Sequence, residues 1–147
     1  MATDEAPKIP VIRHAFLESE KYYKQEFDVL VDLDATSPLR NVADINEAYE
    51  QFVEEDADIL ITASPCRKNP YFNMVERVNG RIRIVKELDK IPVYRQDAPQ
   101  VFEMKADYIW KRKTLLESDT LFTDKTSIYV IPEERSVDID TQLDWEF

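Results

Sequence analysis

Two acidic residues separated by one position form the pattern with the clearest chemical potential in this chain. They belong to the segment Ser136-Val137-Asp138-Ile139-Asp140. Side chains alternate along an extended segment, so both carboxylates point to one face and the isoleucine to the other. Hard oxygen ligands at that separation suit Mg²⁺, which proteins bind through one or two carboxylates together with substrate phosphates. The alternative is a solvated acidic turn, because short Asp-x-Asp sequences are frequent by chance.

A second polar segment follows an apolar stretch much earlier in the chain. Residues 27–33 predict a strand, and residues 34–40, with the sequence Asp-Ala-Thr-Ser-Pro-Leu-Arg, come directly after it. The strand carries few polar residues before its last positions, which is typical of a strand covered on both faces in a parallel sheet. Ligands of such sheets bind beyond the carboxyl ends of the strands. We therefore expect residues 34–40 to border a ligand site.

These two segments, in this order, resemble motifs of the CMP-sialic acid synthetases, the acylneuraminate cytidylyltransferases. Further matching pieces are residues 2–4 (Ala-Thr-Asp), 69–72 (Asn-Pro-Tyr-Phe) and 95–99 (Arg-Gln-Asp-Ala-Pro), so the resemblance covers nearly the whole chain. It implies a nucleotidyltransferase that transfers CMP from CTP to a nonulosonic acid, such as sialic or legionaminic acid, and releases pyrophosphate. It also implies Mg²⁺ as the cofactor and a homodimer as the assembly.

The resemblance assigns roles to individual residues. Asp138 and Asp140 match the family's magnesium carboxylates and are the implied catalytic and metal-binding pair. The residues that match substrate-binding positions are Asp34, Thr36, Ser37, Arg40, Arg95, Gln96 and Tyr108. An arginine suits the sugar-acid pocket because its planar guanidinium pairs bidentately with a carboxylate.

The chain departs from the family pattern at two places. Asp34-Ala35 stands where many members have Gln-Pro, which leaves the identity of the sugar acid open. Residues 105–107, Lys-Ala-Asp, replace the small polar start of the segment that precedes Tyr108. The side chain of Tyr108 is therefore either part of a pocket wall or part of the core.

The glycine content indicates that one part of the family's site is missing. Members of the family wrap the CTP phosphates with a glycine-rich loop, because such a loop needs close backbone approach and positive φ angles. This chain contains one glycine, Gly80. We therefore expect the chain to be the later part of a synthetase domain, without the first βαβ region that carries that loop. The alternative is a non-catalytic partner or assembly module that kept the fold.

Composition limits the class of protein further. Hydrophobic residues make up 44% of the 147 positions, enough for one core of ordinary domain size, and the net charge is −11. That charge argues against binding to nucleic acid or to an anionic membrane. The chain has no run of 18 apolar residues, and its single cysteine, Cys66, excludes an internal disulfide. We expect a cytoplasmic protein.

The apolar periodicity predicts one α/β domain over residues 1–147. The resemblance implies that its fold is an incomplete three-layer fold of the Rossmann-like nucleotidyltransferase type. Asp4 is the expected cap of a first helix that takes Pro7 in its first turn and ends near Gln25. Its expected buried face comprises Ile9, Ile12, Phe16, Ser19 and Tyr23. The later elements expected are a helix capped by Asn41, strands at 58–62, 101–110 and 127–131, and helices at 113–121 and 141–145.

Between these elements the pattern changes to a hairpin. Residues 71–78 and 81–87 flank Asn79-Gly80, the strongest short signal for a two-residue hairpin turn. Alternation predicts one apolar face made by Phe72, Met74, Val78, Ile82 and Ile84. A lone hairpin is unstable in water, so this face needs a cover. We expect a protruding hairpin, residues 71–87, that mediates dimerisation; the alternative is a hairpin folded back on its own domain.

Overall fold

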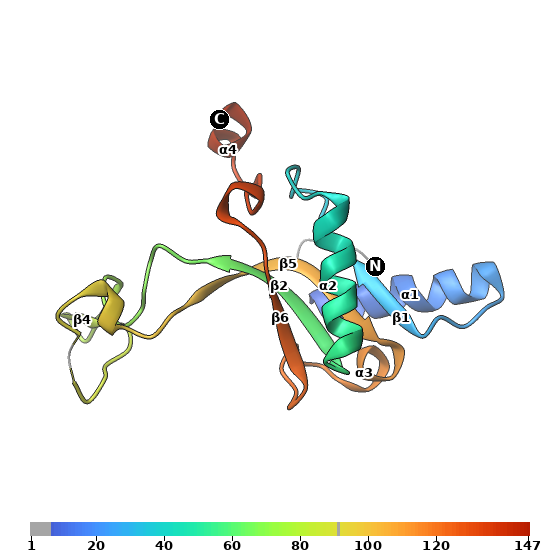
Figure 1. The fold of residues 1–147 in the computed structure, drawn as a ribbon, viewed down its shortest axis with the longest axis horizontal. Coiled ribbons are helices and arrows are strands. Elements are labelled where there is room, and N and C mark those ends of the chain that lie inside the picture. The colour runs from blue at the N-terminus through green and yellow to red at the C-terminus, as the bar shows by residue number, and fades with distance from the viewer. Residues whose placement is uncertain (1–6, 91) are drawn as a thin grey trace.

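A mixed four-stranded sheet forms the centre of the computed structural model, which describes residues 7–90 and 92–147 (Figure 1). The strand order is β1-β5-β2-β6. Strand β5 runs antiparallel to both of its neighbours, β1 and β2, whereas β2 and β6 are parallel. Their bounds are β1 Val29–Asp32, β2 Ile59–Pro65, β5 Phe102–Lys111 and β6 Thr126–Val130. Strands β1, β2 and β6 therefore share one direction.

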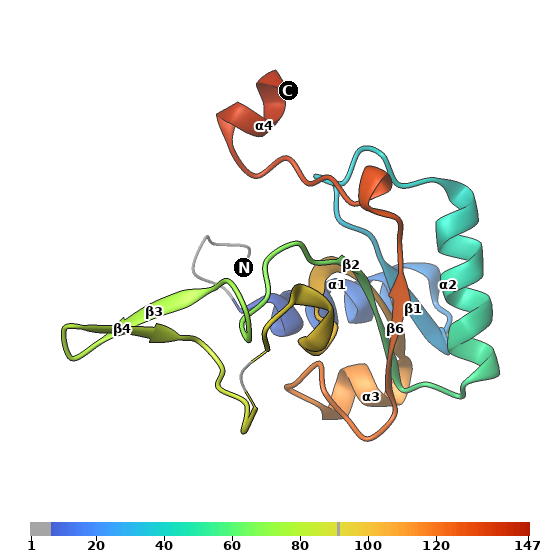
Figure 2. The same cartoon turned by 60° about the vertical axis from the view of Figure 1, so that its left-hand side comes forward.

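Helices cover both faces of this sheet. Helices α1 (Lys8–Tyr23) and α3 (Arg112–Glu117) pack on one face, and α2 (Val42–Glu54) packs on the other (Figures 1 and 2). The first core cluster comprises Phe16, Ile59, Ile61, Tyr108, Trp110 and Leu115; the second comprises Ala48, Phe52, Ala57, Leu60 and Ile109. Neighbouring residues of β2 and β5 thus enter opposite clusters, as strand alternation requires. The predicted three-layer α/β fold is confirmed.

The position of β5 differs from what the sequence pattern predicts. The strands predicted at 27–33 and 58–62 correspond to β1 and β2, and the composition of the first is typical of a parallel sheet. They are parallel to each other, but β5 lies between them and pairs with both. A buried parallel strand and a buried central antiparallel strand have the same apolar composition, so composition alone does not identify the neighbour.

Several helix boundaries are local consequences of the sequence. Asn41 caps α2 with a capping box completed by Asp44, as predicted. Helix α1 begins at Lys8, after Pro7, so the proline is not in its first turn; Asp4 lies outside the described residues. The end of its buried face is Glu20, whereas Tyr23 is 66% exposed. The predicted face was therefore wrong at Ser19 and Tyr23.

The bounds of the last two helices differ from those predicted. Helix α3 stops at Glu117 and does not reach Leu121. The last helix, α4 (Gln142–Glu146), starts after its cap Thr141 and stands away from the sheet in both views (Figures 1 and 2). Two short 3-10 turns, Arg95–Asp97 and Glu133–Arg135, lie in the connections before β5 and after β6. None of the described helices is long and apolar enough to cross a membrane.

The predicted hairpin forms a separate two-stranded sheet, β3 (Val75–Val78) and β4 (Arg81–Ile84), which projects from the body of the molecule (Figure 2). Asn79 and Gly80 have φ angles of 51° and 77°, which fits the predicted tight turn.

The single apolar face predicted for the hairpin is wrong. Directly paired residues share a face, and the pairs are Val75 with Ile84, Arg77 with Ile82, and Val78 with Arg81. Ile82 and Ile84 therefore lie with Val75 on one face, and Val78 lies on the other. The two-residue turn pairs even-numbered with odd-numbered positions, so even-numbered residues of β4 share a face with odd-numbered residues of β3.

Candidate functional site

The two polar segments singled out in the sequence lie side by side at the carboxyl ends of the parallel strands. Residues 34–40 follow β1, and residues 136–140 follow β6. The Ser37 hydroxyl donates a hydrogen bond of 2.6 Å to Oδ1 of Asp138, and the Ile139 amide donates one of 3.0 Å to the carbonyl of Thr36. The contact brings Ser37 and Asp138, which lie 101 positions apart in the chain, into one cluster.

A lysine that the sequence analysis noted only as a departure from a motif completes this cluster. Lys105 Nζ lies 3.0 Å from Oδ2 of Asp138 and 3.0 Å from Oε1 of Glu103, and the residue is only 8% exposed. Burial alone would lower the pKa of Lys105, but its hydrogen bonds and charge interactions with Asp138 and Glu103 outweigh burial and raise that pKa. The ammonium is therefore charged at neutral pH.

An irregularity in β5 places this lysine. Ile61 pairs with Tyr108 and Ala63 pairs with Met104, so residues 105–107 of β5 lie opposite the single residue Thr62 of β2. Bulges of this kind bend a strand and re-aim its side chains, and they are common next to functional sites. Here the bulge carries both buried charged residues of β5, Lys105 and Asp107.

Asp107 holds the residues that follow β1. Its Oδ1 accepts hydrogen bonds from Arg40 Nη1 at 2.6 Å and from the Asp34 amide at 2.7 Å. Arg40 Nη2 also donates to the carbonyl of Asp34 at 3.0 Å. The guanidinium of Arg40 is thus largely buried and turned toward the protein, where it fixes the loop that carries Ser37.

The carboxylate of Asp34 is also used within the loop. Its Oδ1 accepts from the Thr36 amide at 2.9 Å and from the Thr36 hydroxyl at 2.8 Å. The amide hydrogen bond is the main reason that the pKa of Asp34 is lowered. Asp34, Thr36 and Arg40 therefore shape the loop, and among the predicted residues of this loop Ser37 is the one that contacts a predicted metal ligand.

A cleft of about 580 Å³ opens beside the cluster. Asp138, Asp140, Lys105 and Glu103 line it, together with Arg67 and Lys68, which follow β2. Within residues 7–90 and 92–147 no group of three His, Cys, Asp or Glu side chains is placed to hold a metal ion. Asp138 and Asp140 both border the cleft, however, and Mg²⁺ sites that are completed by substrate phosphates need no more than one or two carboxylates. The donors fit such a shared site.

A second cleft of about 360 Å³ contains the predicted residues Arg95 and Gln96. The two clefts share lining residues, Pro65, Cys66, Arg67 and Glu133. Arg95 Nη2 donates a hydrogen bond to the carbonyl of Arg67. Tyr108, in contrast, is buried in the first core cluster beside Trp110, which resolves its position in favour of the core.

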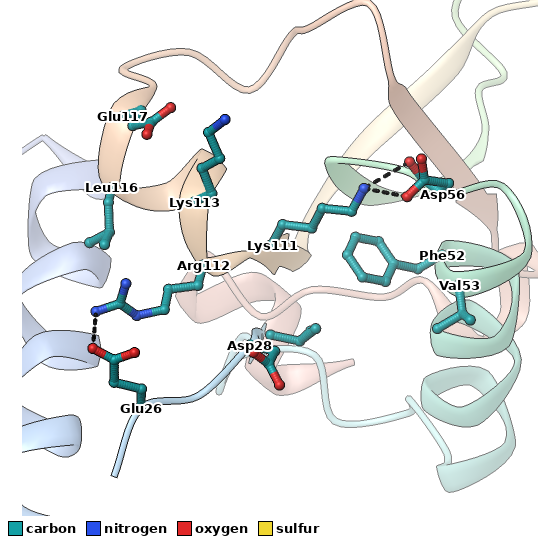
Figure 3. A pocket seen from close by; sticks show the side chains of 11 residues that line it. Glu26, Asp28, Phe52, Val53, Asp56, Lys111, Arg112, Lys113, Leu116 and Glu117 are labelled. Atoms are coloured by element: carbon teal, nitrogen blue, oxygen red, sulfur yellow. Dashed lines mark hydrogen bonds and ion pairs between the residues drawn. The ribbon is translucent and has the colours of Figure 1, made fainter. Parts of the chain in front are cut away.

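A larger pocket, of about 640 Å³, lies at the opposite end of the sheet (Figure 3). It contains none of the predicted site residues. Two of its three basic residues are paired: Lys111 Nζ lies 2.6 Å from Asp56 Oδ1, and Arg112 pairs with Glu20 at 2.8 Å and with Glu26 at 3.5 Å. The carboxyl ends of β1, β2 and β6 point away from this pocket, so we place the candidate site in the first cleft.

No family model matches the chain, but curated proteins do. It is 44% identical over 147 residues to the post-translational flagellin modification protein B of Campylobacter coli. It is 46% identical over 147 residues to the CMP-N,N'-diacetyllegionaminic acid synthase of Campylobacter jejuni subsp. jejuni serotype O:2. Each match covers 99% of this chain and 62% of the relative. More distant relatives are named N-acylneuraminate cytidylyltransferase and pseudaminic acid cytidylyltransferase.

A solved structure supports the fold. A CMP:2-keto-3-deoxy-manno-octonic acid synthetase complexed with CTP superimposes with a TM-score of 0.62 at 9% identity, covering 97% of this chain and 66% of that one. The curated relatives confirm the resemblance to the acylneuraminate cytidylyltransferases that the sequence motifs indicate. The chain spans about three fifths of the length of these two Campylobacter relatives.

Proposed function

We propose that this chain, a homologue of the acylneuraminate-type cytidylyltransferases, provides part of a site that transfers CMP from CTP to a nonulosonic sugar acid with release of pyrophosphate. The observation that carries this proposal is the meeting of Ser37, Lys105 and Asp138 at the carboxyl ends of the parallel strands. The similarity to a CMP-legionaminic acid synthase over 99% of the chain supports the reaction class.

The carboxylates give the site its proposed metal position. Asp138 and Asp140 would hold Mg²⁺ on the wall of the cleft. A bound Mg²⁺ would neutralise phosphate charge and polarise the phosphorus that is attacked. Asp140 is suited to this role, because no hydrogen bond or ion pair within residues 7–90 and 92–147 reaches its carboxylate.

Basic and polar residues of the two clefts are the proposed contacts for the sugar acid. Arg95 and Gln96 line the smaller cleft, and Arg67 borders both clefts. A guanidinium pairs bidentately with a carboxylate, so Arg95 would bind the carboxylate of the sugar acid and Gln96 one of its hydroxyls. Arg95 must exchange its contact with the Arg67 carbonyl for the ligand.

These 147 residues contain few glycines that could build a loop around the triphosphate of CTP. Gly80, the one glycine of the chain, lies in the turn of the hairpin and not near the clefts. A loop that wraps phosphates needs glycines, because their backbone approaches the anion closely. We therefore place the contacts to the β- and γ-phosphates of CTP outside this chain's residues.

The proposal includes an assembly and a location. The hairpin carries exposed apolar residues, of which Ile82 is 59% exposed, on a face shared with Val75 and Ile84. A second copy of the chain would cover that face in a twofold dimer. We propose a cytoplasmic location, with which the single free thiol of the chain, Cys66, is compatible.

A chimera tests the proposed activity. The 147 residues would replace the matching region of the Campylobacter jejuni CMP-N,N'-diacetyllegionaminic acid synthase, to which they are 46% identical. With CTP, Mg²⁺ and a panel of nonulosonic acids we expect pyrophosphate release and a CMP-linked product, both lost in the Asp138→Ala chimera. A folded chimera that forms no product with any acid would contradict the proposal.

The same experiment addresses the second candidate function, a non-catalytic partner module. The low glycine content favours this candidate, because one glycine among 147 residues is too few to build a glycine-rich phosphate-binding loop. A partner module would bind the intact synthase as a separate chain and would not restore turnover in the chimera. Binding is measured by sedimentation of the mixed proteins.

A further inference from the structure

Lys105 occupies the carboxylate that the proposed function assigns to the metal. Both oxygens of Asp138 already have donors, the Ser37 hydroxyl at 2.6 Å on Oδ1 and the Lys105 ammonium at 3.0 Å on Oδ2. The ammonium has a second anionic partner in Glu103, whose side chain is 59% exposed. The positive charge in the cluster is thus supplied by the protein's own side chain.

This arrangement sets the ammonium and a divalent cation in competition. Mg²⁺ binds a carboxylate oxygen at about 2.0–2.1 Å. On Oδ2 of Asp138 it would share that oxygen with an ammonium 3.0 Å away. Like charges this close repel more strongly in a partly buried site than in water, because the effective dielectric constant is lower. The metal therefore gains full access to Asp138 only when the ammonium moves.

The cleft gives the side chain of Lys105 space in which to move. Its flexible four-carbon stem carries a compact charge with three donors, and it faces the cleft next to Glu103. An anionic group of a ligand, either a phosphate or a carboxylate, would offer the ammonium a partner of the same charge as Asp138. The exchange would leave Asp138 open to the metal while the ammonium stays paired.

We propose that Lys105 is a resident cation that competes with the divalent metal for Asp138 and releases this carboxylate when an anionic ligand group takes the ammonium as its partner. The inference rests on the proposed function, because that function makes Asp138 a metal ligand. Metal and anionic ligand then bind cooperatively, and each strengthens the binding of the other by the same factor.

Binding of Mn²⁺ to the purified chain, followed by the electron paramagnetic resonance of free Mn²⁺, tests the competition without any turnover. Lys105→Met should bind Mn²⁺ at least about tenfold more tightly than the wild type, and Lys105→Arg should match the wild type. The matched control is Lys68→Met, which removes one charge from an exposed lysine of the same cleft. Its effect should stay below about threefold.

An affinity of Lys105→Met equal to that of the wild type, or to that of Lys68→Met, would overturn the proposal. Circular dichroism checks folding, and Lys105→Gln replaces Lys105→Met if that variant unfolds. CMP is the probe for the anionic ligand: it should tighten Mn²⁺ binding to the wild type more than to Lys105→Met. An equal effect on both would overturn the release step. Because no product is formed, an inactive chimera with these shifts intact would refute the proposed function alone.

Discussion

The ion pair of Arg40 and Asp107 is expected to hold the loop that presents Ser37 to Asp138. The substitution Arg40→Met keeps the apolar stem of the side chain and removes the guanidinium. It breaks the 2.6 Å contact with Asp107 and the 3.0 Å contact with the carbonyl of Asp34. The carboxylate of Asp107 then stays buried with the Asp34 amide as its remaining donor among the described contacts.

The size of the effect follows from burial. Exposed ion pairs contribute about 0–1 kcal/mol, whereas removing one partner of a buried pair costs about 3–5 kcal/mol. The side chains of Arg40 and Asp107 are 17% and 6% exposed, which is close to the buried case. The remaining hydrogen bond from the Asp34 amide moderates the loss. We expect Arg40→Met to lower the free energy of unfolding by about 3 kcal/mol, and the melting temperature by about 6–12 °C.

Urea denaturation of four proteins measures this: the wild type, Arg40→Met, Asp107→Asn and the double variant. Asp107→Asn keeps an oxygen for the Asp34 amide and removes the charge. In that background Arg40→Met should cost at least about 1.5 kcal/mol less than in the wild type. The reasoning is refuted if Arg40→Met costs less than about 1 kcal/mol, or costs the same in both backgrounds.

Three further predictions concern the metal, the hairpin and pH. In the chimera, Asp138→Ala and Asp140→Ala should each lower turnover at limiting Mg²⁺ by at least about tenfold. Asp140→Ala should leave the melting temperature nearly unchanged, whereas Asp138→Ala should lower it because the buried Lys105 loses a partner; normal turnover in both would make the pair a structural turn. Ile82→Glu should shift a dimer toward monomer in sedimentation, and a monomeric parent at high concentration would refute the interface. Burial and the hydrogen bond to Glu47 raise the pKa of Tyr129 from 10.0 to about 12. The contribution of Tyr129 to the free energy of unfolding should thus be complete below pH 10 and be lost as pH rises toward 12. Denaturation across that range measures it, and the free energy of unfolding of Tyr129→Phe should fall less steeply.

The features that depend on short stretches of chain could be predicted from the sequence. Asn79-Gly80 specifies its turn through its own backbone preferences, and Asn41 caps its helix through bonds to the next turn. The meeting of residues 34–40 with residues 136–140 was also predictable in outline, because both follow strands that run in the same direction.

Features that depend on pairing between distant strands could not be predicted in this way. The insertion of β5 between β1 and β2 is decided by long-range pairing among strands of equal apolar composition. The bulge opposite Thr62 follows from that pairing, and with it the burial of Lys105 and Asp107. One signal was present in the sequence: charged residues at 103, 105 and 107 interrupt a predicted strand at two-residue spacing.

Arg40 shows that a motif can identify a residue without identifying the contacts that its side chain makes. The resemblance assigned it to substrate binding, but its guanidinium is bound to Asp107 and to the Asp34 carbonyl. Arg40 would affect a ligand indirectly, by fixing the position of Ser37. Sequence similarity predicts an arginine at this position but does not predict the orientation of its side chain.

The most direct test of the central claim, that the cleft beside Asp138 is the metal-dependent site, is Mn²⁺-induced broadening of backbone amide resonances in the ¹⁵N-labelled chain with CMP present. The account predicts that broadening centres on the amides of Asp138 and Asp140 and extends to Ser37. Broadening centred on Asp56, beside the pocket of Figure 3 at the opposite end of the sheet, would contradict it.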